Sequence, residues 1–382
     1  MLTALIHARV LTTQGLEDDL AVIIDGPRIR HVARRRELHL GGMECVDLEG
    51  MLLAPGFIDL QVNGGGDVLF NDEPSRATLE RMVAAHLRFG TTSMLPTLIS
   101  SDRETLARAL AVVEDAVLSD VPGILGLHVE GPFIAVDRRG VHDASHCRGM
   151  EDEDVARLAH PHRGVRLVTL APERVDPTRI AQLRGAGVIV ALGHSDATYE
   201  VTRQALAAGA AGFTHLFNAM SPMLARAPGV VGAALEDRQA WCGIINDGHH
   251  VHSAVLKVAL AAKPAGMVFL VTDAMPPVGG VRETFFLDGR EIRCNNGRCT
   301  TGDGTLAGSA LDMATAVRNT VRDLGIETAE ALRMASEYPA MALGLAHERG
   351  RVSPGCWADL VAMDSDLRVQ RVWQRGVRTV PR

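Results

Sequence analysis

The sequence is poor in aromatic residues, has no excess of basic charge and contains no long apolar run. Of its 382 residues 4% are aromatic, and 39 Lys and Arg are outnumbered by 46 Asp and Glu, for a net charge of −7. This balance leaves no basic stripe for nucleic acid. No uncharged apolar stretch reaches the ~18 residues of a membrane span, and the N-terminal apolar run is too short for a signal peptide. We expect a soluble, cytoplasmic protein with neither nucleic-acid nor membrane partners.

Cysteine is also scarce and forms no pattern. The six cysteines lie at positions 45, 147, 242, 294, 299 and 356, and no two form a C-x-x-C pair. Scattered cysteines are typical of reduced thiols in a cytosol rather than of a disulfide framework. Cys294 and Cys299 are placed to meet across a hairpin, but the expected compartment favours free thiols there too.

What the sequence does have is short apolar runs that alternate with amphipathic segments. Eight runs end in polar residues or glycine, as buried parallel strands do: 56–64, 91–99, 123–131, 165–173, 188–195, 212–220, 242–250 and 267–275. Eight strands alternating with helices predict a (β/α)8 TIM-type barrel, an α/β fold of about 250 residues. A doubly wound open sheet is the rival fold, but no G-x-G-x-x-G follows the first strand.

Local signals mark some of the intervening helices. The segment from Ser101 to Glu104 is predicted to be a capping box ahead of a helix with one apolar stripe. Gly209 is placed to end the helix that begins near residue 198. The spacer 228–240 predicts only a short helix.

The two ends of the chain differ from the middle. Residues 1–54 and 346–382 show short strands and turns, and neither segment holds enough apolar residues for a core of its own. We expect the two segments to pair into one small β-sandwich domain, with the barrel of 55–345 inserted between them.

A further β piece is predicted within 276–304. Asp288-Gly289 and Asn296-Gly297 are hairpin turn signals in this segment. Because the segment follows the eighth strand, we expect this β-hairpin insertion to lie over the mouth of the barrel.

Ligand-type side chains stand at the expected carboxyl ends of the strands, where the reactive groups of such barrels lie. They are Gln61, Asn63, Glu130, His194, His215, His249, His250 and Asp273. One carboxylate and two imidazoles, from Glu130, His194 and His215, form a tripod suited to a catalytic zinc with one open position. Each histidine alone is more often a hydrogen-bonded barrel residue, so the prediction depends on their shared location.

Asp273, at the end of the eighth strand, is placed to act as general base and then general acid beside such a metal. The alternative is a carboxylate that only orients a ligand histidine. His128 shares a strand face with Glu130, and we expect it to be structural or to support the ligands.

Candidates outside the strands are fewer. His142 lies in the loop after the third strand and is placed to polarise a carbonyl oxygen, although a loop histidine is more often at the surface. No Walker loop or glycine cradle is present. Arg226 and His250 are therefore the nearest cationic candidates for a phosphate, with a solvent-exposed charge as the alternative for Arg226.

Several motifs together resemble one family. The segments "APGFIDLQVNGGGDVLFND", "GLHVEGPFI", "ALGHSDATY", "THLFNAMSPM", "INDGHHVH", "LVTDAM" and "GTLAGSALDM" resemble the N-acetylglucosamine-6-phosphate deacetylase family of the amidohydrolase superfamily. The tail "GRVSPGCWADLVAMD" is similar to the strand by which amidohydrolases return to their small β domain. The resemblance covers nearly the whole chain. It implies hydrolysis of the N-acetyl group of N-acetyl-D-glucosamine 6-phosphate to D-glucosamine 6-phosphate and acetate, one or two divalent metals, and a homodimer.

The resemblance also implies a role for each matching residue. It implies metal binding by Glu130, His194 and His215, general base and acid catalysis by Asp273, and polarisation of the acetyl carbonyl by His142. It implies sugar or phosphate contacts for Asn218, Ala219 and His250, phosphate binding across a dimer interface for Arg226, and an acetyl pocket lined by Leu306, Ala307 and Gly308. The family pattern requires no histidine at His249, which receives no role.

One departure from the wider superfamily concerns the first strand. Many amidohydrolases carry H-x-H there, and those imidazoles hold a second metal. Here the positions are Gln61 and Asn63, whose neutral amides are poor zinc ligands but can hydrogen-bond a water at the metal. We therefore expect one divalent ion per chain, Zn2+ first, with Fe2+ or another divalent metal as alternatives.

Two other functions stay open. One is deacetylation of a related N-acyl sugar phosphate, such as N-acetylgalactosamine 6-phosphate. The other is a catalytically inactive barrel that serves as a binding module, against which the intact tripod and Asp273 argue.

Overall fold

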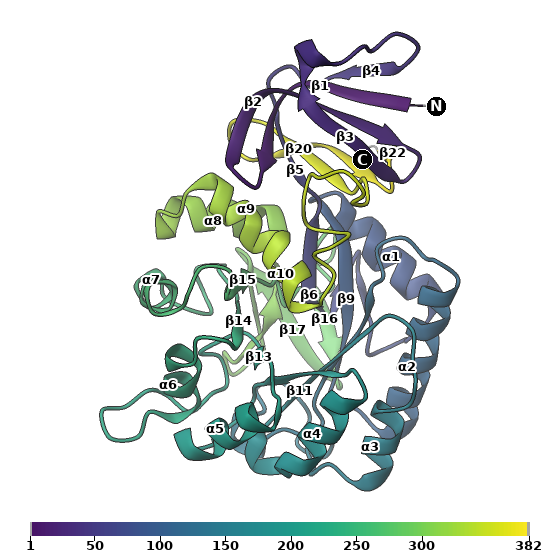
Figure 1. Cartoon of the computed structure of the whole chain (residues 1–382). Coiled ribbons are helices and arrows are strands. Elements are labelled where there is room, and N and C mark those ends of the chain that lie inside the picture. Colours follow the sequence, from purple (N-terminus) through teal and green to yellow (C-terminus); the bar gives the residue numbers. More distant parts are fainter. Residues whose placement is uncertain (1, 380–382) are drawn as a thin grey trace.

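The computed structural model describes residues 2–379, and a ring of eight parallel strands forms its centre (Figure 1). In order around the ring, the strands are β6 (Phe57–Val62), β9 (Thr91–Ile99), β10 (Gly126–Glu130), β11 (Val165–Leu170), β12 (Ile189–Leu192), β13 (Gly212–Phe213), β14 (Trp241–Ile244) and β15 (Val268–Leu270). The ring closes where Asn63 N–H donates to the Ala274 carbonyl at 2.9 Å and Asp273 N–H donates to the Gln61 carbonyl at 3.0 Å. All eight predicted strands are present, so the (β/α)8 barrel is confirmed and the open sheet is wrong.

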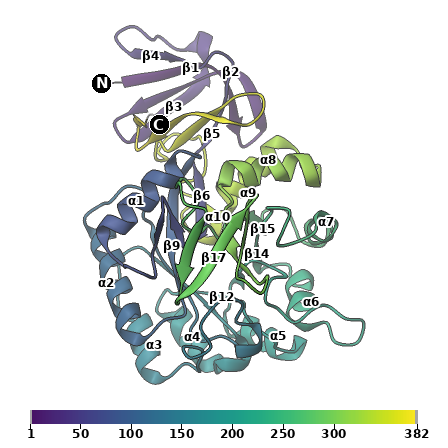
Figure 2. The same ribbon diagram turned by 180° about the vertical axis from the view of Figure 1, so that it is seen from behind.

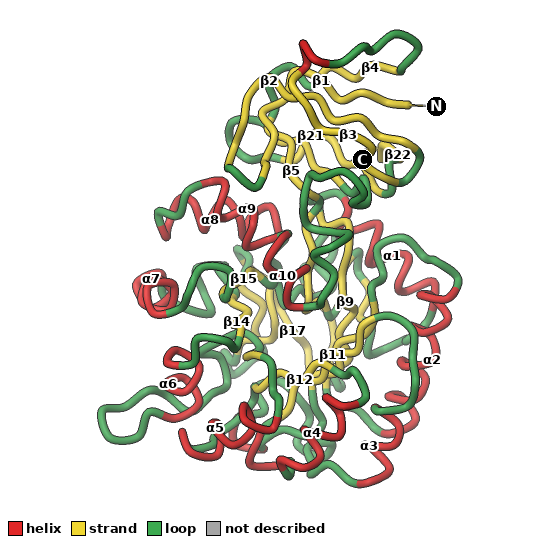
Figure 3. Tube along the Cα trace, in the orientation of Figure 1, coloured by secondary structure: helices red, strands yellow, loops and turns green. Residues whose placement is uncertain are grey.

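Helices cover the outside of this ring (Figure 3). They are α1 (Arg76–Leu87), α2 (Arg103–Leu118), α3 (Asp152–Leu158), α4 (Pro177–Gly185), α5 (Tyr199–Ala208), α6 (Gly229–Glu236), α7 (Ser253–Ala262), α8 (Met313–Leu324), α9 (Thr328–Ala335) and α10 (Glu337–Ala342). The 3-10 turns η2 (Val136–Arg138) and η3 (Pro172–Arg174) follow β10 and β11, whereas η1 (Arg35–Glu37) follows a strand of the N-terminal segment. Within residues 2–379 no helix has the length and apolar character needed to cross a membrane.

The helix signals read from the sequence are only partly correct. Asp102, not Ser101, caps α2, because its Oδ1 accepts a hydrogen bond from Thr105 N–H at 2.7 Å. With the cap moved by one residue, Glu104 falls one position short of that required for a capping box, so this prediction is wrong. Gly209 does end α5, with a φ of 115° that glycine adopts without a side-chain clash.

Apolar side chains fill the space between strands and helices and hold the strand ends in place. Phe57 and Phe213 are fully buried, and Phe269 is 1% exposed. Each such side chain contributes about 1.5–3 kcal/mol of burial free energy. A close-packed interior of this kind lets polar groups at the strand ends keep fixed positions relative to one another.

The two ends of the chain share a second sheet, which lies beyond one end of the barrel (Figure 1). It contains β1 (Leu2–Thr12), β2 (Gly15–Asp25), β3 (Arg28–Arg34), β4 (Glu44–Asp47), β5 (Leu52–Pro55), β20 (Leu360–Met363), β21 (Val369–Gln374) and β22 (Val377–Thr379). Antiparallel pairing of β5 with β20 joins the N-terminal to the C-terminal segment. We propose that 1–54 with 346–382 form a domain distinct from the barrel of 55–345.

The predicted β insertion follows β15 as a four-stranded antiparallel sheet, whose strand β17 crosses in front of the barrel strands in Figure 2. Its strands are β16 (Thr284–Leu287), β17 (Arg290–Asn295), β18 (Arg298–Thr300) and β19 (Leu306–Ser309), and a small hairpin of β7 (Gly64–Gly65) and β8 (Val68–Leu69) follows β6. Both hairpin turns are confirmed, since residues 288–289 connect β16 to β17 and residues 296–297 connect β17 to β18.

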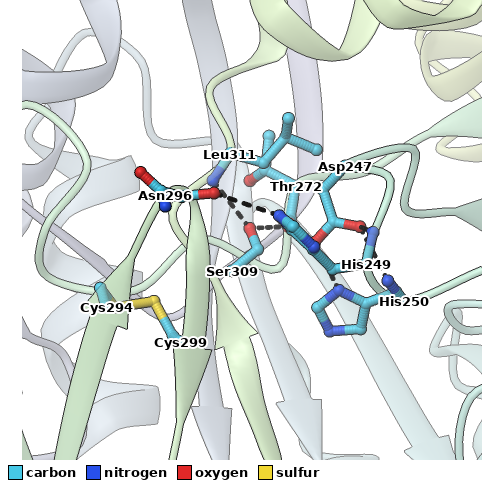
Figure 4. The surroundings of a disulfide bond; sticks show 9 residues. All are labelled: Asp247, His249, His250, Thr272, Cys294, Asn296, Cys299, Ser309 and Leu311. Atoms are coloured by element: carbon cyan, nitrogen blue, oxygen red, sulfur yellow. Dashed lines mark hydrogen bonds and ion pairs between the residues drawn. A yellow bond between two sulfur atoms is a disulfide. The ribbon is translucent and has the colours of Figure 1, made fainter.

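The expectation of free thiols in this insertion is wrong. The register of β17 and β18 places Cys294 directly opposite Cys299, with their Cα atoms 4.0 Å apart, and the two form a disulfide (Figure 4). The hairpin geometry therefore outweighs the argument from compartment. Cys45, Cys147 and the buried Cys242 and Cys356 are free.

Candidate active site

Three ligand-type side chains meet at the mouth of the barrel. Glu130 ends β10, and His194 and His215 lie just beyond the ends of β12 and β13. Glu130 Oε1 is 3.2 Å from His194 Nε2 and 3.0 Å from His215 Nε2, and the two Nε2 atoms are 3.0 Å apart. All three residues are buried, with exposed fractions of 2% for Glu130, 6% for His194 and 3% for His215. The fold thus brings together the three residues that the strand-end pattern singles out.

The hydrogen bonds of the two rings show what this cluster suits. His194 Nδ1 lies 2.8 Å from the carbonyl oxygen of Arg138, which can only accept, so Nδ1 carries the proton and Nε2 offers a lone pair. His215 Nδ1 is buried and has no partner within residues 2–379. Electron-rich atoms this close require a shared proton or a cation. Two imidazoles and a carboxylate fit a divalent metal, with His194 oriented as a ligand.

Charge within the cluster shifts two pKa values. Burial raises the pKa of the Glu130 carboxyl, but hydrogen bonds and charges from His194 and His215 outweigh burial and hold the pKa well below its usual range. Burial lowers the pKa of His215, but the Glu130 carboxylate outweighs burial and raises it overall. Glu130 is therefore ionised near neutral pH, as a metal ligand must be.

Gln61 and Asn63 contact the same cluster from the end of β6. Gln61 Nε2 donates to Glu130 Oε1 at 2.9 Å and to Asp273 Oδ1 at 3.1 Å, and Asn63 Nδ2 donates to Asp273 Oδ1 at 2.6 Å. From the sequence we expect these amides to place a water. This role stays a prediction. In the structure their N–H groups donate to the two carboxylates, so the amides also help to hold Glu130 and Asp273 in position.

Asp273 lies just past β15, beside the tripod. Burial and then the nearby charge of Glu130 raise the pKa of Asp273 to about 6, against the opposing hydrogen bond from Asn63. A carboxylate whose pKa is near the working pH takes up and returns a proton efficiently. A cation on the tripod would lower this pKa again.

The backbone around the cluster adopts rare conformations. His194, His215, Ala219 and Asp273 have φ values of 49°, 31°, 53° and 52°, in the left-handed region. Each costs on the order of 1–3 kcal/mol for a residue with a side chain, and such residues concentrate at functional sites. The strain is consistent with a backbone shaped for these side chains rather than for stability.

His142, from the loop after β10, is buried against the tripod, with its ring centroid 4.5 Å from that of His194. Its Nδ1 accepts from the backbone N–H of Ser100 at 3.3 Å, and Ser100 Oγ lies 2.8 Å away. In the neutral ring the proton is therefore on Nε2, which becomes a hydrogen-bond donor. Burial, together with His194, lowers the pKa of His142 to about 3, so the ring is neutral.

His128 occupies a different environment inside the barrel. Its Nε2 lies 2.8 Å from Thr169 Oγ1, and its Nδ1 lies 3.3 Å from Thr97 Oγ1. Burial is the main cause that lowers its pKa to about 4, so this imidazole is neutral and satisfied by hydroxyls of neighbouring strands. These contacts agree with a structural role.

A cavity of about 490 Å³ contains most of the candidate residues. Those that line it are Asn63, Glu130, His142, His194, His215, Asn218, Ala219, His250, Asp273, Leu306 and Gly308. Alternation along β19 turns the side chain of Ala307 into the apolar cluster under the insertion, and its place in the acetyl pocket stays a prediction. Arg226 is exposed in the loop between β13 and α6 and does not line the cavity of its own chain.

The cavity also has lining residues that the sequence did not single out. Asp137, Arg138 and Gly140 precede His142 in its loop, and Arg298 and Thr305 come from the insertion. Arg138 stands in "DRRGVH", next to a candidate, and that proximity was the available signal. Nothing local separates Arg298 from the other arginines, since only pairing of the insertion brings it to the cavity.

The two adjacent histidines after β14 have different contacts. His250 Nδ1 lies 2.6 Å from Asp247 Oδ2. His249 Nε2 donates to the backbone carbonyl of Asn296 at 3.1 Å, so it connects this loop to the β17–β18 turn (Figure 4). His249, which has no role by resemblance, thus fixes part of the cavity wall.

Comparison with known proteins adds independent information. The chain matches the amidohydrolase family over residues 52–379. It is 44% identical over 325 residues to an N-acetylgalactosamine-6-phosphate deacetylase of Shewanella sp. (strain ANA-3), covering 85% of this chain and 82% of that protein. It is 37% identical over 369 residues to an N-acetylglucosamine-6-phosphate deacetylase of Haemophilus influenzae, covering 96% of each. The crystal structure of N-acetylglucosamine-6-phosphate deacetylase from Pasteurella multocida superposes with a TM-score of 0.96, at 36% identity and full coverage of both chains.

Proposed function

Because the chain belongs to the amidohydrolase family, we propose that it hydrolyses the N-acetyl group of N-acetyl-D-glucosamine 6-phosphate, giving D-glucosamine 6-phosphate and acetate. The observation that carries this proposal is one cavity with three complementary parts. A carboxylate–imidazole tripod fits a metal, Asp273 has a pKa raised to about 6, and His142 is a neutral donor. This set serves amide hydrolysis.

We propose that Glu130, His194 and His215 hold one divalent ion per chain, Zn2+ first and Fe2+ as the alternative. When bound, such an ion polarises a carbonyl oxygen and lowers the pKa of water. Gln61 and Asn63 direct N–H groups at the carboxylates, which supports a single ion. Two tightly bound ions per chain by elemental analysis would contradict it.

The proton transfers are assigned to Asp273 and the carbonyl contact to His142. Asp273 takes one proton of the attacking water and later delivers it to the leaving nitrogen as the C–N bond breaks. The second proton of the water passes from the acetic acid product to the amine, so ammonium and acetate form and the Asp273 carboxylate is unchanged. The Nε2–H of His142 donates to the acetyl oxygen as negative charge develops on it, and the low-dielectric, buried surroundings strengthen this interaction.

The remaining lining residues are assigned to substrate contacts. Asn218, Ala219 and His250 would contact the sugar or phosphate, and Leu306 and Gly308 would line the acetyl pocket. Gly308 has a φ of 58°, and a Cβ there would lie 2.7 Å from the Met275 side chain. No larger residue fits, so this wall is shaped by glycine.

We also propose a homodimer in which Arg226 reaches the neighbouring active site. Its loop, residues 221–228, projects from the barrel beside α6 (Figure 1). Met223 and Leu224 in this loop are 54% and 59% exposed, apolar surface that a partner would cover. Sedimentation should give a dimer. Arg226→Ala should raise KM for the phosphorylated sugar far more than for N-acetylglucosamine.

N-acetylgalactosamine 6-phosphate is a second candidate substrate, because the relative from Shewanella that carries this name is 44% identical. Acetate release from both epimers, measured side by side with and without chelator, tests the proposal. We expect activity on N-acetylglucosamine 6-phosphate that chelation removes and Zn2+ restores. A higher kcat/KM for the galactosamine isomer would favour the second candidate, and activity that survives exhaustive chelation would overturn the metal mechanism. We propose a cytoplasmic location for the enzyme, since four of its six cysteines are free thiols and the Cys294–Cys299 disulfide is the exception.

A further inference from the structure

The cavity holds two arginines, and their surroundings differ. Arg138 pairs with Asp196, with its Nη2 2.7 Å from Oδ1, so its guanidinium already has a partner in the chain. Arg298 has no hydrogen bond or ion pair from its guanidinium to any residue in 2–379. An exposed arginine is usually unremarkable, but this one lines the same cavity as the tripod and His250.

Strand alternation explains why Arg298 faces the cavity. The next residue, Cys299, is fully buried in the apolar cluster beneath the insertion, with Phe285 and Ile292. Successive side chains of a strand point to opposite faces, so Arg298 lies on the face away from that cluster. The register pairs Arg298 with Asn295 on one side and Ser309 on the other.

Three contacts limit the motion of this part of the wall. The Cys294–Cys299 disulfide closes the hairpin loop that contains Arg298 (Figure 4). At the turn of this hairpin, His249 Nε2 donates to the Asn296 carbonyl (Figure 4). Ser309 N–H donates to the Asp273 carbonyl at 2.9 Å, which joins the insertion to the catalytic strand end. Arg298 and His250, on the two segments that the His249–Asn296 contact joins, both line the cavity.

We propose that Arg298 is a substrate-binding residue that takes the phosphate of the sugar phosphate within its own chain, an assignment that rests on the proposed function. A planar guanidinium donates two hydrogen bonds at once to a phosphate. His250, which the proposed function places at the sugar or phosphate, lines the same cavity as Arg298, and the adjacent His249 contacts the turn that precedes Arg298. Arg298 then adds a contact to the one proposed for Arg226 and contributes to the selection of phosphorylated over neutral sugars.

Calorimetric binding of D-glucosamine 6-phosphate and of D-glucosamine to the metal-loaded enzyme tests this assignment without turnover. Arg298→Ala should weaken binding of the phosphorylated sugar about 10- to 100-fold, the range for hydrogen bonds to a charged group. Arg298→Lys should recover part of this loss, because the charge remains but the fork does not. The matched control is Arg293→Ala on β17, an arginine of the same hairpin that pairs with Glu291 outside the cavity.

The possible results distinguish failure of the proposed function from failure of the assignment of Arg298. If wild-type enzyme releases acetate from neither epimer, the proposed function fails and this assignment fails with it. If wild-type enzyme is active but Arg298→Ala binds D-glucosamine 6-phosphate like wild type, only the assignment of Arg298 is wrong. Equal losses for D-glucosamine and its phosphate would also overturn it, since Arg298 would then contact the sugar ring. If Arg293→Ala weakens the binding of D-glucosamine 6-phosphate as much as Arg298→Ala does, the loss reflects the charge of the hairpin as a whole and the assignment of Arg298 is wrong.

Discussion

Two buried carboxylates at opposite ends of the barrel, Glu130 and Asp359, have different partners. At the floor, Asp359 accepts from Arg349 Nη1 at 2.5 Å and from the backbone N–H of Arg375 at 2.7 Å, so a permanent cation from the chain compensates it. At the mouth, Glu130 is shared by two imidazoles whose charge depends on protonation. The chain itself supplies the cation at the floor, whereas the mouth suits a cation from outside. The difference separates stability from function.

The largest expected effect is at the mouth. Glu130→Gln should lose the metal and on the order of 10³-fold or more in kcat/KM, because even hydrogen-bonding partners of metal ligands account for about 10- to 100-fold. Elemental analysis and the acetate assay measure both losses. Glu80→Gln on α1, an exposed glutamate, is the control. A Glu130→Gln enzyme with wild-type metal content and kcat/KM would show that Glu130 is not a metal ligand.

Asp273→Asn separates holding the metal from moving the proton. We expect kcat to fall about 10²- to 10⁴-fold, the usual contribution of a general base, while metal content stays at the wild-type value. The amide would still receive one hydrogen bond from Gln61 or Asn63. Near wild-type kcat would show that Asp273 only orients its neighbours.

Arg349→Ala tests the floor. The variant leaves Asp359 buried without its cation, which should lower the free energy of unfolding by about 3–5 kcal/mol. Urea unfolding measures this loss, and activity per folded molecule should stay close to wild type. Arg76→Ala, which removes an exposed i,i+4 pair with Glu80, should cost about 0.3–0.5 kcal/mol. Equal losses in the free energy of unfolding for Arg349→Ala and Arg76→Ala would show that the buried pair with Asp359 contributes no more than an exposed one.

A third carboxylate, Asp154 at the start of α3, is expected to make the free energy of unfolding depend on pH in the acid range. Burial raises its pKa, but hydrogen bonds from Arg148, the Glu151 N–H and Arg103 outweigh burial and lower the pKa to about 2. Because the folded pKa lies below the ordinary value of 3.8, its stabilisation is complete above about pH 4 and is lost as the pH falls toward 2. Urea midpoints between pH 2 and 5 should therefore depend less on pH in Asp154→Asn than in wild type. Identical profiles would remove this role.

The smallest expected effect is that of the disulfide. Replacing Cys294 and Cys299 by serine should cost at most about 2 kcal/mol, since the bond closes a loop of only a few residues. KM for the sugar phosphate should rise less than in Arg298→Ala, because the His249–Asn296 contact still holds the turn. Thermal unfolding and KM check both points, and a KM above that of Arg298→Ala would contradict them.

Much of this architecture is readable from short-range patterns. Apolar runs bounded by polar residues identify all eight barrel strands, and their carboxyl ends point to Glu130, His194, His215 and Asp273. Other features do not follow from these patterns. The Asp102 cap of α2 is a local contact, but Ser101 offers the same signal one residue earlier, and the oxidation state of Cys294 and Cys299 does not follow from their spacing. The donors on Glu130 and the buried side chain of Ala307 depend on contacts between segments far apart in the chain, which no local pattern carries.

The sequence by itself determined the order of the strands and which side chains stand at their ends, because strand period and apolar content are local properties. Only the tertiary structure decided the protonated nitrogen of His142 and His194, since the Ser100 N–H and the Arg138 carbonyl come from other segments. It also decided that Gln61 and Asn63 donate to carboxylates and that Arg298 reaches the cavity. Hydrogen-bond partners and unpaired charges are properties of positions in space, and those exist only once the barrel has closed.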